Sequence, residues 1–330
     1  MSAQVAPVAG ASWAIPGKAL KTTVVMLVVL LAPVVLAGAV VGPEAALPMA
    51  LAEVMCLTVA AKLTPQYAAL MVALVAVTVA VAVSLNGLPF PAACFAVLVC
   101  LMVAPANMFE LGLLSAVPPM AAVFLASPGL TLDPALTAMW ALLGGLFVVV
   151  LLARVAPPDR RHPIGAVTAF RHATVMAVAM GVSVFLVLQF EVPHGYWVPM
   201  TMALVLQPFG AETTTLARQR IAGTIGGGLL ALGLALVLPT GVVAVAVVPL
   251  MVLGVAYSIL GRYSKSVMFL TPSAVLLANL ASRDAEISAT LHRLVATLVG
   301  GIVAAALALL LERADAEQPS PADPESTEVV

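Results

Sequence analysis

Long apolar runs follow one another along almost the whole chain, and they constrain its fold more than any motif does. A helix needs about 20 mainly apolar residues to cross a bilayer, and breaks at proline, glycine and charged residues divide the chain into twelve candidate spans. These are 18–41, 44–63, 66–86, 90–105, 107–126, 133–155, 169–190, 195–209, 216–238, 241–260, 265–282 and 287–311. The pattern predicts an all-α polytopic membrane protein.

The charge content excludes the main soluble alternatives. Only 9% of the 330 residues are charged and the mean hydropathy is +1.15, whereas soluble proteins carry about 25% charged residues. So few charges cannot cover the surface of a soluble enzyme or a secreted disulfide scaffold, and a net charge of −1 does not attract nucleic acid. The bilayer is therefore the expected environment.

The distribution of basic residues sets the expected orientation. With the N-terminus in the cytoplasm, twelve Lys and Arg fall inside and only Arg283 and Arg293 fall outside, as the positive-inside rule requires. We therefore expect an inner, or plasma, membrane protein with both termini cytoplasmic.

Weak internal echoes divide the chain into two halves. Pro48-Met49 is echoed by Pro199-Met200, and Gly144-Gly145 by Gly300-Gly301. An even number of spans per half predicts two parallel six-helix repeats. The expected division is an N-terminal tail (1–17), a first half (18–155), a cytoplasmic linker (156–168), a second half (169–311) and a disordered acidic tail (312–330).

A second echo lies inside the second half and carries the candidate binding site. Arg220-x-x-x-Thr224-x-x-Gly227 opens one span and Arg293-x-x-x-Thr297-x-x-Gly300 opens another, and each spacing places its three residues on one helix face. Arginine binds a carboxylate through a planar, permanently charged fork, and a threonine one turn deeper can donate a second hydrogen bond. Each arginine has an alternative role as an interface anchor, and each threonine as a donor to its own backbone.

The span at 195–209 is short and interrupted by proline, which in transporters points to a binding site. Trp197 and Thr201 share one of its faces, and Gln207 lies near its far end. Trp197 is either an interfacial belt residue or a stacking surface for an aromatic ligand. Gln207 is expected to face protein or a cavity, because a polar group facing lipid is costly.

Glu53 is the outlier of the first half, because it lies at the centre of an apolar run from Ala45 to Ala61. An acidic residue at mid-bilayer costs about 2.5–3.5 kcal/mol on insertion scales. It is either a neutral structural residue or a protonatable group that couples transport to protons.

The stretch 195–231, GYWVPMTMALVLQPFGAETTTLARQRIAGTIGGGLLA, resembles the fusaric-acid-resistance-like (FUSC) proteins of the aromatic acid exporter superfamily. The matching pieces are Tyr196-Trp197, Thr201, Gln207-Pro208 and the motif of Arg220, followed by the second arginine helix at Arg293. The close match covers about residues 169–311. We expect no counterpart of the large cytoplasmic domain that many family members carry, and Ala69 and Thr137 stand near the places of the arginines in the first half.

This resemblance implies an inner-membrane exporter of small organic, chiefly aromatic carboxylic, acids, with a periplasmic adaptor protein as an optional partner. Proton coupling is the expected mode. The alternatives are a passive organic-anion channel and a non-transporting component of an export complex. No P-loop, HExxH motif or Ser/His/Asp arrangement occurs in the sequence, so we expect no enzyme activity, no metal and no cofactor.

Overall fold

The computed structural model describes residues 13–60, 63–108, 115–127, 132–152, 164–238, 240–278 and 283–316. All regular elements within these ranges are α-helices, so the predicted all-α class is confirmed. They are α1 (Gly17–Val40), α2 (Pro43–Ala60), α3 (Pro65–Leu85), α4 (Pro89–Leu101), α5 (Val103–Met108), α6 (Val117–Leu125), α7 (Pro134–Leu152), α8 (Ala166–Gln189), α9 (Trp197–Val205), α10 (Gly210–Val237), α11 (Thr240–Ile259), α12 (Tyr263–Ala278) and α13 (Arg283–Ala316).

Three parts of the predicted division lie partly outside the described residues. These are most of the N-terminal tail 1–17, most of the linker 156–168, and the part of the acidic tail that follows Ala316. Helix α13 continues to Ala316, a few residues into the segment expected to be disordered.

The helix boundaries follow from proline and glycine chemistry. Helices α3, α4 and α7 begin with Pro65, Pro89 and Pro134, because the first position of a helix needs no N–H donor and suits the fixed φ of proline. At the other end, Gly42 and Gly87 have φ of 128° and 82° and follow the ends of α1 and α3. Residues with a Cβ rarely adopt such angles, so these glycines end the helices and turn the chain.

Seven helical stretches of the described chain are long and apolar enough to cross a membrane. They are Gly17–Val40, Pro65–Leu85, Pro89–Met108, Pro134–Leu152, Ala166–Gln189, Glu212–Val237 and Thr290–Leu310. Many large apolar side chains on these helices are exposed, among them Val28 of α1 and Leu229 of α10. A helix that presents such a surface needs lipid around it, so the chain is a multi-pass membrane protein.

One expected span has a different form. The sequence predicts a single helix over 107–126, of which 109–114 lie outside the described residues. In the described part, α5 reaches Met108, residues 115–116 form a turn, and α6 covers only Val117–Leu125. Pro118 and Pro119 explain where α6 begins. Proline is tolerated in the first turn of a helix, but in a helix interior its ring clashes with the carbonyl group four residues earlier. All nine residues of α6 are buried, so it is a short internal helix.

The short helices α6 and α9 pack against each other between the two halves of the chain. Backbone carbonyls at the ends of both helices contact side chains from elsewhere in the fold, one directly after α3 and one on α8. Inside a membrane protein, backbone groups that leave a helix need such partners. The Nδ2 of Asn86 donates to the carbonyl oxygens at the end of α6, those of Phe124 (2.8 Å), Leu125 (3.1 Å) and Ser127 (2.9 Å). The imidazole Nε2 of His172 lies 3.4 Å from the carbonyl oxygen of Leu206, at the end of α9.

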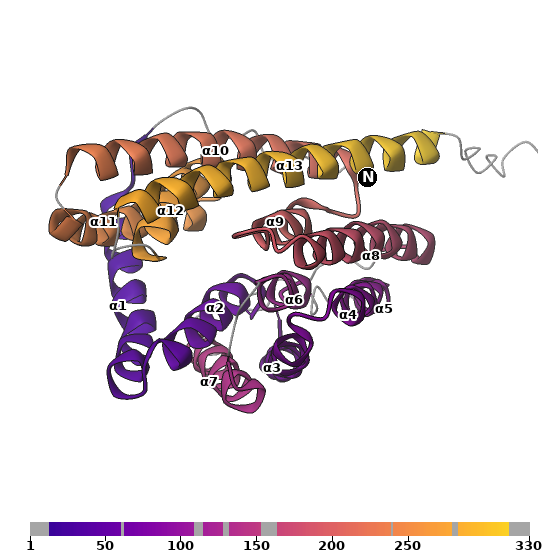
Figure 1. The fold of residues 1–330 in the computed structure, drawn as a ribbon, viewed down its shortest axis with the longest axis horizontal. Helices are drawn as coiled ribbons and strands as arrows, with labels where there is room; N and C mark the ends of the chain where they lie inside the picture. The colour runs from indigo at the N-terminus through magenta and orange to yellow at the C-terminus, as the bar shows by residue number, and fades with distance from the viewer. Residues whose placement is uncertain are drawn as a thin grey trace, which may run out of the picture.

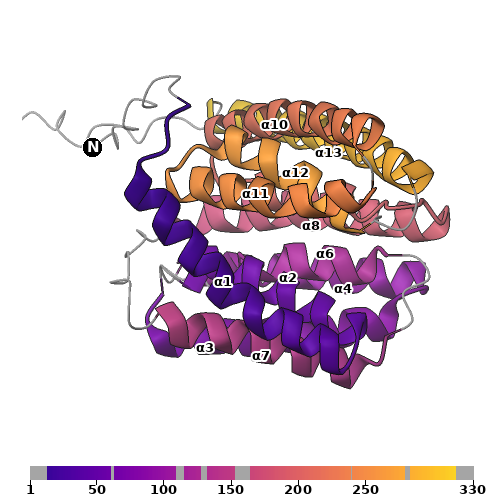
Figure 2. The ribbon, with the colours of Figure 1, turned by 90° about the vertical axis from the view of Figure 1, so that its left-hand side faces the viewer.

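The helices form two blocks (Figure 1). One contains α2–α7, and the other contains α8–α13 (Figure 2). Helix α4 packs against α8, and α1 leans across the blocks to contact both α2 and α11. The first helix of each half therefore contacts the other half.

Helices α10 and α13 are antiparallel neighbours and pack through glycine. An added Cβ on Gly228 would lie 2.8 Å from the side chain of Leu294, and one on Gly301 would lie 2.8 Å from that of Ile221. Residue 228 of α10 therefore lies opposite residue 294 of α13, and residue 221 lies opposite residue 301. These two pairs show that the helices run antiparallel and define which residues face each other. On another face of α10, a Cβ on Gly223 or Gly227 would lie 2.5 Å from the carbonyl oxygens of Ser264 and Met268 of α12. Small residues allow these close helix approaches.

Candidate functional site

Arg293 stacks on an aromatic ring. Its guanidinium carbon lies 3.7 Å from the centroid of the Trp197 ring, a cation–π geometry. The ring of Tyr196 lies 4.9 Å from that of Trp197. Because the guanidinium covers one face of Trp197, a ligand could stack on Trp197 only from its other face.

Arg220 lies on the facing helix and contacts α12. Its Nη1 donates to the hydroxyl of Tyr263 at 3.0 Å. Arg220 and Arg293 are 6% and 7% exposed, and each lies ten residues after the first residue of its helix. An anchor that reaches the membrane surface would be exposed, so this burial does not favour the anchor interpretation.

The crossing of α10 and α13 places the two arginine motifs against each other. The contacts of Gly228 with Leu294 and of Gly301 with Ile221 put Thr224 and Thr297 at about the same level. Both threonines are buried. Since the helices run in opposite directions, Arg220 and Arg293 flank this level from opposite sides and remain close enough to interact electrostatically.

Several buried donors around this crossing have no hydrogen-bond partner. They are Nε of Arg220, Nε and Nη1 of Arg293, and the hydroxyl of Thr201. The hydroxyl of Thr271, at the contact of α10 with α12, is also buried without a partner. Thr201 packs beside Gly300 of α13, and Thr271 beside Gly227 of α10. Among the residues whose side chains the structure describes, which leaves out the first turn of α13, no acidic side chain pairs with either arginine. A buried charge without a partner is costly, so the arrangement is suited to an anion.

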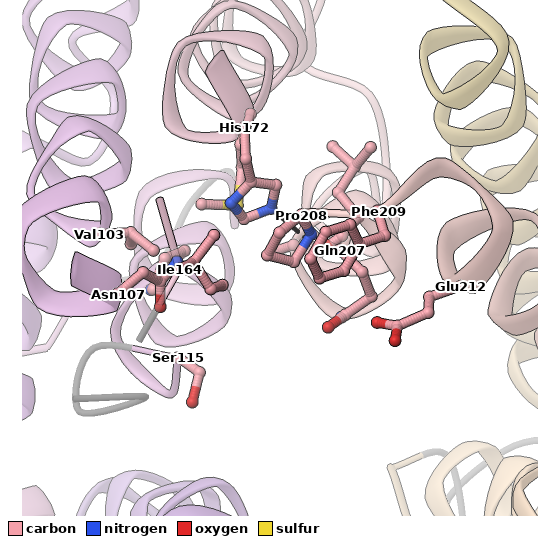
Figure 3. Close-up of a pocket in the computed structure, with 13 residues that line it drawn as sticks. Val103, Asn107, Ser115, Ile164, His172, Gln207, Pro208, Phe209 and Glu212 are labelled. Atoms are coloured by element: carbon pink, nitrogen blue, oxygen red, sulfur yellow. Dashed lines mark hydrogen bonds between the residues drawn. The ribbon is translucent and has the colours of Figure 1, made fainter. Parts of the chain in front are cut away.

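The structure thus brings together six of the seven residues predicted to bind substrate: Arg220, Thr224, Arg293, Thr297, Trp197 and Thr201. Gln207 lies elsewhere, beyond the C-terminal end of α9, and the whole length of that helix, about 13 Å, separates it from Trp197. Its backbone N–H donates to the hydroxyl of Thr213 at 2.8 Å, and it lines a cavity with His172 and Glu212 (Figure 3).

Glu53 lies in the other block. It is 3% exposed, on α2, and its Oε1 has no hydrogen-bond partner. Helix α2 packs chiefly against α7 and α1. This carboxyl group is therefore buried in the protein, but it belongs to a different helix pair from the two arginines.

Sequence reasoning missed Tyr263, Thr271 and His172. Tyr263 and Thr271 lie on α12, which shows no repeat of the arginine motif, so no spacing marked them. His172 follows Arg171 near the start of α8, and the only signal for it was an ionisable residue within an apolar run.

The fold and the site define a multi-pass α-helical membrane protein with a buried cationic centre in its second half. Residues 182–307 match the family described as fusaric acid resistance protein-like. The matched segment begins within α8, ends within α13 and includes all seven predicted substrate-binding residues, so the resemblance is confirmed over this part of the chain. Neither a curated protein nor a solved structure matches the chain.

Proposed function

We propose that the protein exports small organic acids, chiefly aromatic carboxylates, across the inner membrane, with both termini in the cytoplasm. The observation that carries this proposal is the pair of buried arginines, Arg220 and Arg293, with unpaired donors and no acidic partner among the described residues. The printed description of the matched family, fusaric acid resistance protein-like, supports an organic acid as the substrate.

In this proposal the carboxylate binds between α10 and α13. Arg293 is held in place by Trp197 and Arg220 by Tyr263, so both forks are oriented before the ligand arrives, which lowers the cost of binding. Thr224, Thr297 and Thr201 line the same crossing and add neutral donors. Gln207 serves the inner end of the pathway, where α9 ends.

We further propose that twelve helical segments form two parallel six-helix repeats, with the short α6 as the fifth segment of the first half. The contacts between blocks support this relation, because the fourth span of each half packs against the first span of the other: α4 against α8, and α11 against α1. Glycine pairs also correspond. Gly144 and Gly145 of α7 pack on α2 and α3, as Gly300 and Gly301 of α13 pack on α9 and α10.

Proton coupling is assigned to Glu53, the buried carboxyl of the half that has no arginine motif. Protonation at one carboxyl and anion binding at a separate site would be linked through movement of one block against the other. A periplasmic adaptor protein is an optional partner in this scheme.

The test is transport by the purified protein in proteoliposomes. A panel of benzoate derivatives is measured with and without a pH gradient, with Arg293→Ala as the matched control. The proposal expects substrate to accumulate against its gradient only when a pH gradient is present. Equilibration without accumulation would indicate a passive channel, and the absence of any flux would exclude transport of these acids.

A further inference from the structure

Residues 13–16, which precede α1 and have no regular secondary structure, lie against the end of α11 and the turn into α12. We call these four residues the N-terminal strap. The strap is held through its backbone: the hydroxyl of Tyr257 donates to the carbonyl oxygen of Trp13 at 2.7 Å, and Nη1 of Arg262 donates to that of Ala14 at 3.2 Å. Tyr257 is 3% exposed, and a buried tyrosine hydroxyl needs such a partner.

The indole ring of Trp13 adds a second set of contacts. Nζ of Lys265 lies 4.4 Å from the centroid of this ring, within the range of a cation–π interaction. The ring of Tyr257 meets that of Trp13 edge to face, with 6.3 Å between the centroids, and stacks on Phe269 of α12 at 5.6 Å. The side chains that hold the strap therefore come from 257–265, the end of α11 and the beginning of α12.

The same turn also holds an arginine of the proposed anion site. Tyr263 is the first residue of α12, and its hydroxyl accepts from Nη1 of Arg220 at 3.0 Å. Backbone hydrogen bonds fix the turn around it, since the N–H of Arg262 donates to the carbonyl oxygen of Tyr257 at 2.9 Å and the N–H of Ser266 donates to that of Arg262 at 3.0 Å. Arg262 thus binds the strap, and the next residue in the chain binds Arg220.

We propose that the N-terminal strap positions Arg220. By holding the turn it holds Tyr263, and Tyr263 orients the guanidinium before the anion arrives, which lowers the cost of binding. This inference rests on the proposed function, because Arg220 belongs to the proposed anion site. The competing interpretation is that the strap only ties α1 to the second half of the chain. A tie alone predicts no effect at Tyr263 or Arg220.

The first test needs no ligand. Full-length protein labelled with 3-fluorotyrosine in lipid nanodiscs gives ¹⁹F signals from its 4 tyrosines, and the signal missing from Tyr263→Phe identifies Tyr263. Arg220→Lys changes the partner of this hydroxyl, so the shift that it causes in the Tyr263 signal measures their contact. This shift should be largely lost in protein that also carries Trp13→Ala, and kept with Trp13→Phe, which retains a ring for Lys265. Because Trp13 is 56% exposed, its removal should leave the fold intact.

The second test measures equilibrium binding of benzoate. Tyr257→Phe removes only the hydroxyl that donates to the strap and should weaken binding about two- to tenfold, the contribution of one hydrogen bond. Tyr67→Phe, which removes the hydroxyl of an exposed tyrosine on α3, should bind as the parent does. In protein that already carries Tyr263→Phe, Tyr257→Phe should have no further effect, because changes that act through one residue do not add.

The two tests separate the strap from the anion site. If the parent protein does not bind benzoate, the proposed function fails, and the Tyr263 signal alone decides the role of the strap. The proposal is overturned if Arg220→Lys shifts the Tyr263 signal equally with and without Trp13→Ala. It is also overturned if Tyr257→Phe leaves the affinity of a benzoate-binding parent unchanged, or weakens it equally in the presence of Tyr263→Phe.

Discussion

The guanidinium carbon of Arg293 lies 3.7 Å from the centroid of the Trp197 ring, which joins the last long helix of the chain to the short helix α9. The stack fixes the plane of the guanidinium, and Nε and Nη1 are left without partners. A charge held in one orientation with unpaired donors can recognise a planar anion such as a carboxylate.

Replacement of Arg293 tests this role. Lysine keeps the charge but loses both the planar fork and the stack on Trp197, so Arg293→Lys should bind an aromatic carboxylate more weakly but still detectably. Arg293→Ala loses a charge-assisted hydrogen bond, worth about 1.5–3 kcal/mol, which corresponds to roughly tenfold or more in Kd. Both are measured by equilibrium binding to purified protein of normal expression. Parental affinity in both variants would remove Arg293 from the site.

Replacement of Glu53 tests coupling. Glu53→Gln resembles the protonated acid and should fold normally, because it removes only the charge of a buried group. We expect accumulation driven by a pH gradient to be lost and exchange of substrate across the membrane to continue. Proteoliposome flux with and without the gradient measures both. Unchanged gradient-driven transport would leave Glu53 with a structural role alone.

A pair of glycine substitutions on α10 tests the helix packing. A Cβ on Gly227 would lie 2.5 Å from the carbonyl oxygen of Met268, whereas one on Gly233 would meet nothing within 4 Å. Gly227→Ala should therefore destabilise the protein by about 1–3 kcal/mol, and Gly233→Ala should be neutral or stabilising by up to about 1 kcal/mol. Thermal unfolding in detergent compares the two. Equal effects would argue against close packing of α10 on α12.

Reporter fusions test the orientation and the parallel halves. Reporters placed after Pro157 and at the C-terminus should both indicate the cytoplasm, and one placed after Asp133 should indicate the outside. The reason is that each half contains an even number of spans in the proposed arrangement. Opposite locations for the first two reporters would contradict it.

The turn before α9 should respond to acid. Burial, and then the nearby charge of His292, lower the pKa of His194 from its ordinary value of 6.5, and the two rings are 5.8 Å apart. A lowered pKa means that the folded state favours neutral imidazole, so this contribution to stability is present above about pH 6.5 and is lost as the pH falls through the lowered pKa. The midpoint of thermal unfolding should fall on acidification. His194→Gln, which cannot titrate, should reduce that fall, and an identical pH dependence would exclude His194 as its source.

The positions of the helices were predictable because lipid leaves the backbone little choice. A segment such as 66–86, apolar throughout and bounded by proline and glycine, can satisfy its backbone groups in a membrane only as a helix, and α3 spans Pro65–Leu85. The short α6 was not predicted, because the apolar composition of 107–126 is equally typical of a full span. The local cause of the short α6 is the Pro118-Pro119 pair, which fixes where the helix begins. The short helix is stabilised by a residue far away in the sequence, because the side-chain amide of Asn86 donates to a carbonyl oxygen at its C-terminal end.

For the site, sequence determined which residues carry the chemistry and tertiary structure decided which of them meet. The repeated Arg-x-x-x-Thr spacing marked four residues, since i, i+4 periodicity already defines a helix face. The antiparallel crossing of α10 and α13 brings the two threonines to one level and places the two arginines on either side of it. The stack of Arg293 on Trp197 and the bond from Arg220 to Tyr263 join different helices, and no spacing along the chain encodes them. The length and direction of α9 keep Gln207 away from the arginines. Gln207 instead lines a cavity together with His172. Periodicity determines the face of one helix, but the packing of several helices determines which faces share a site.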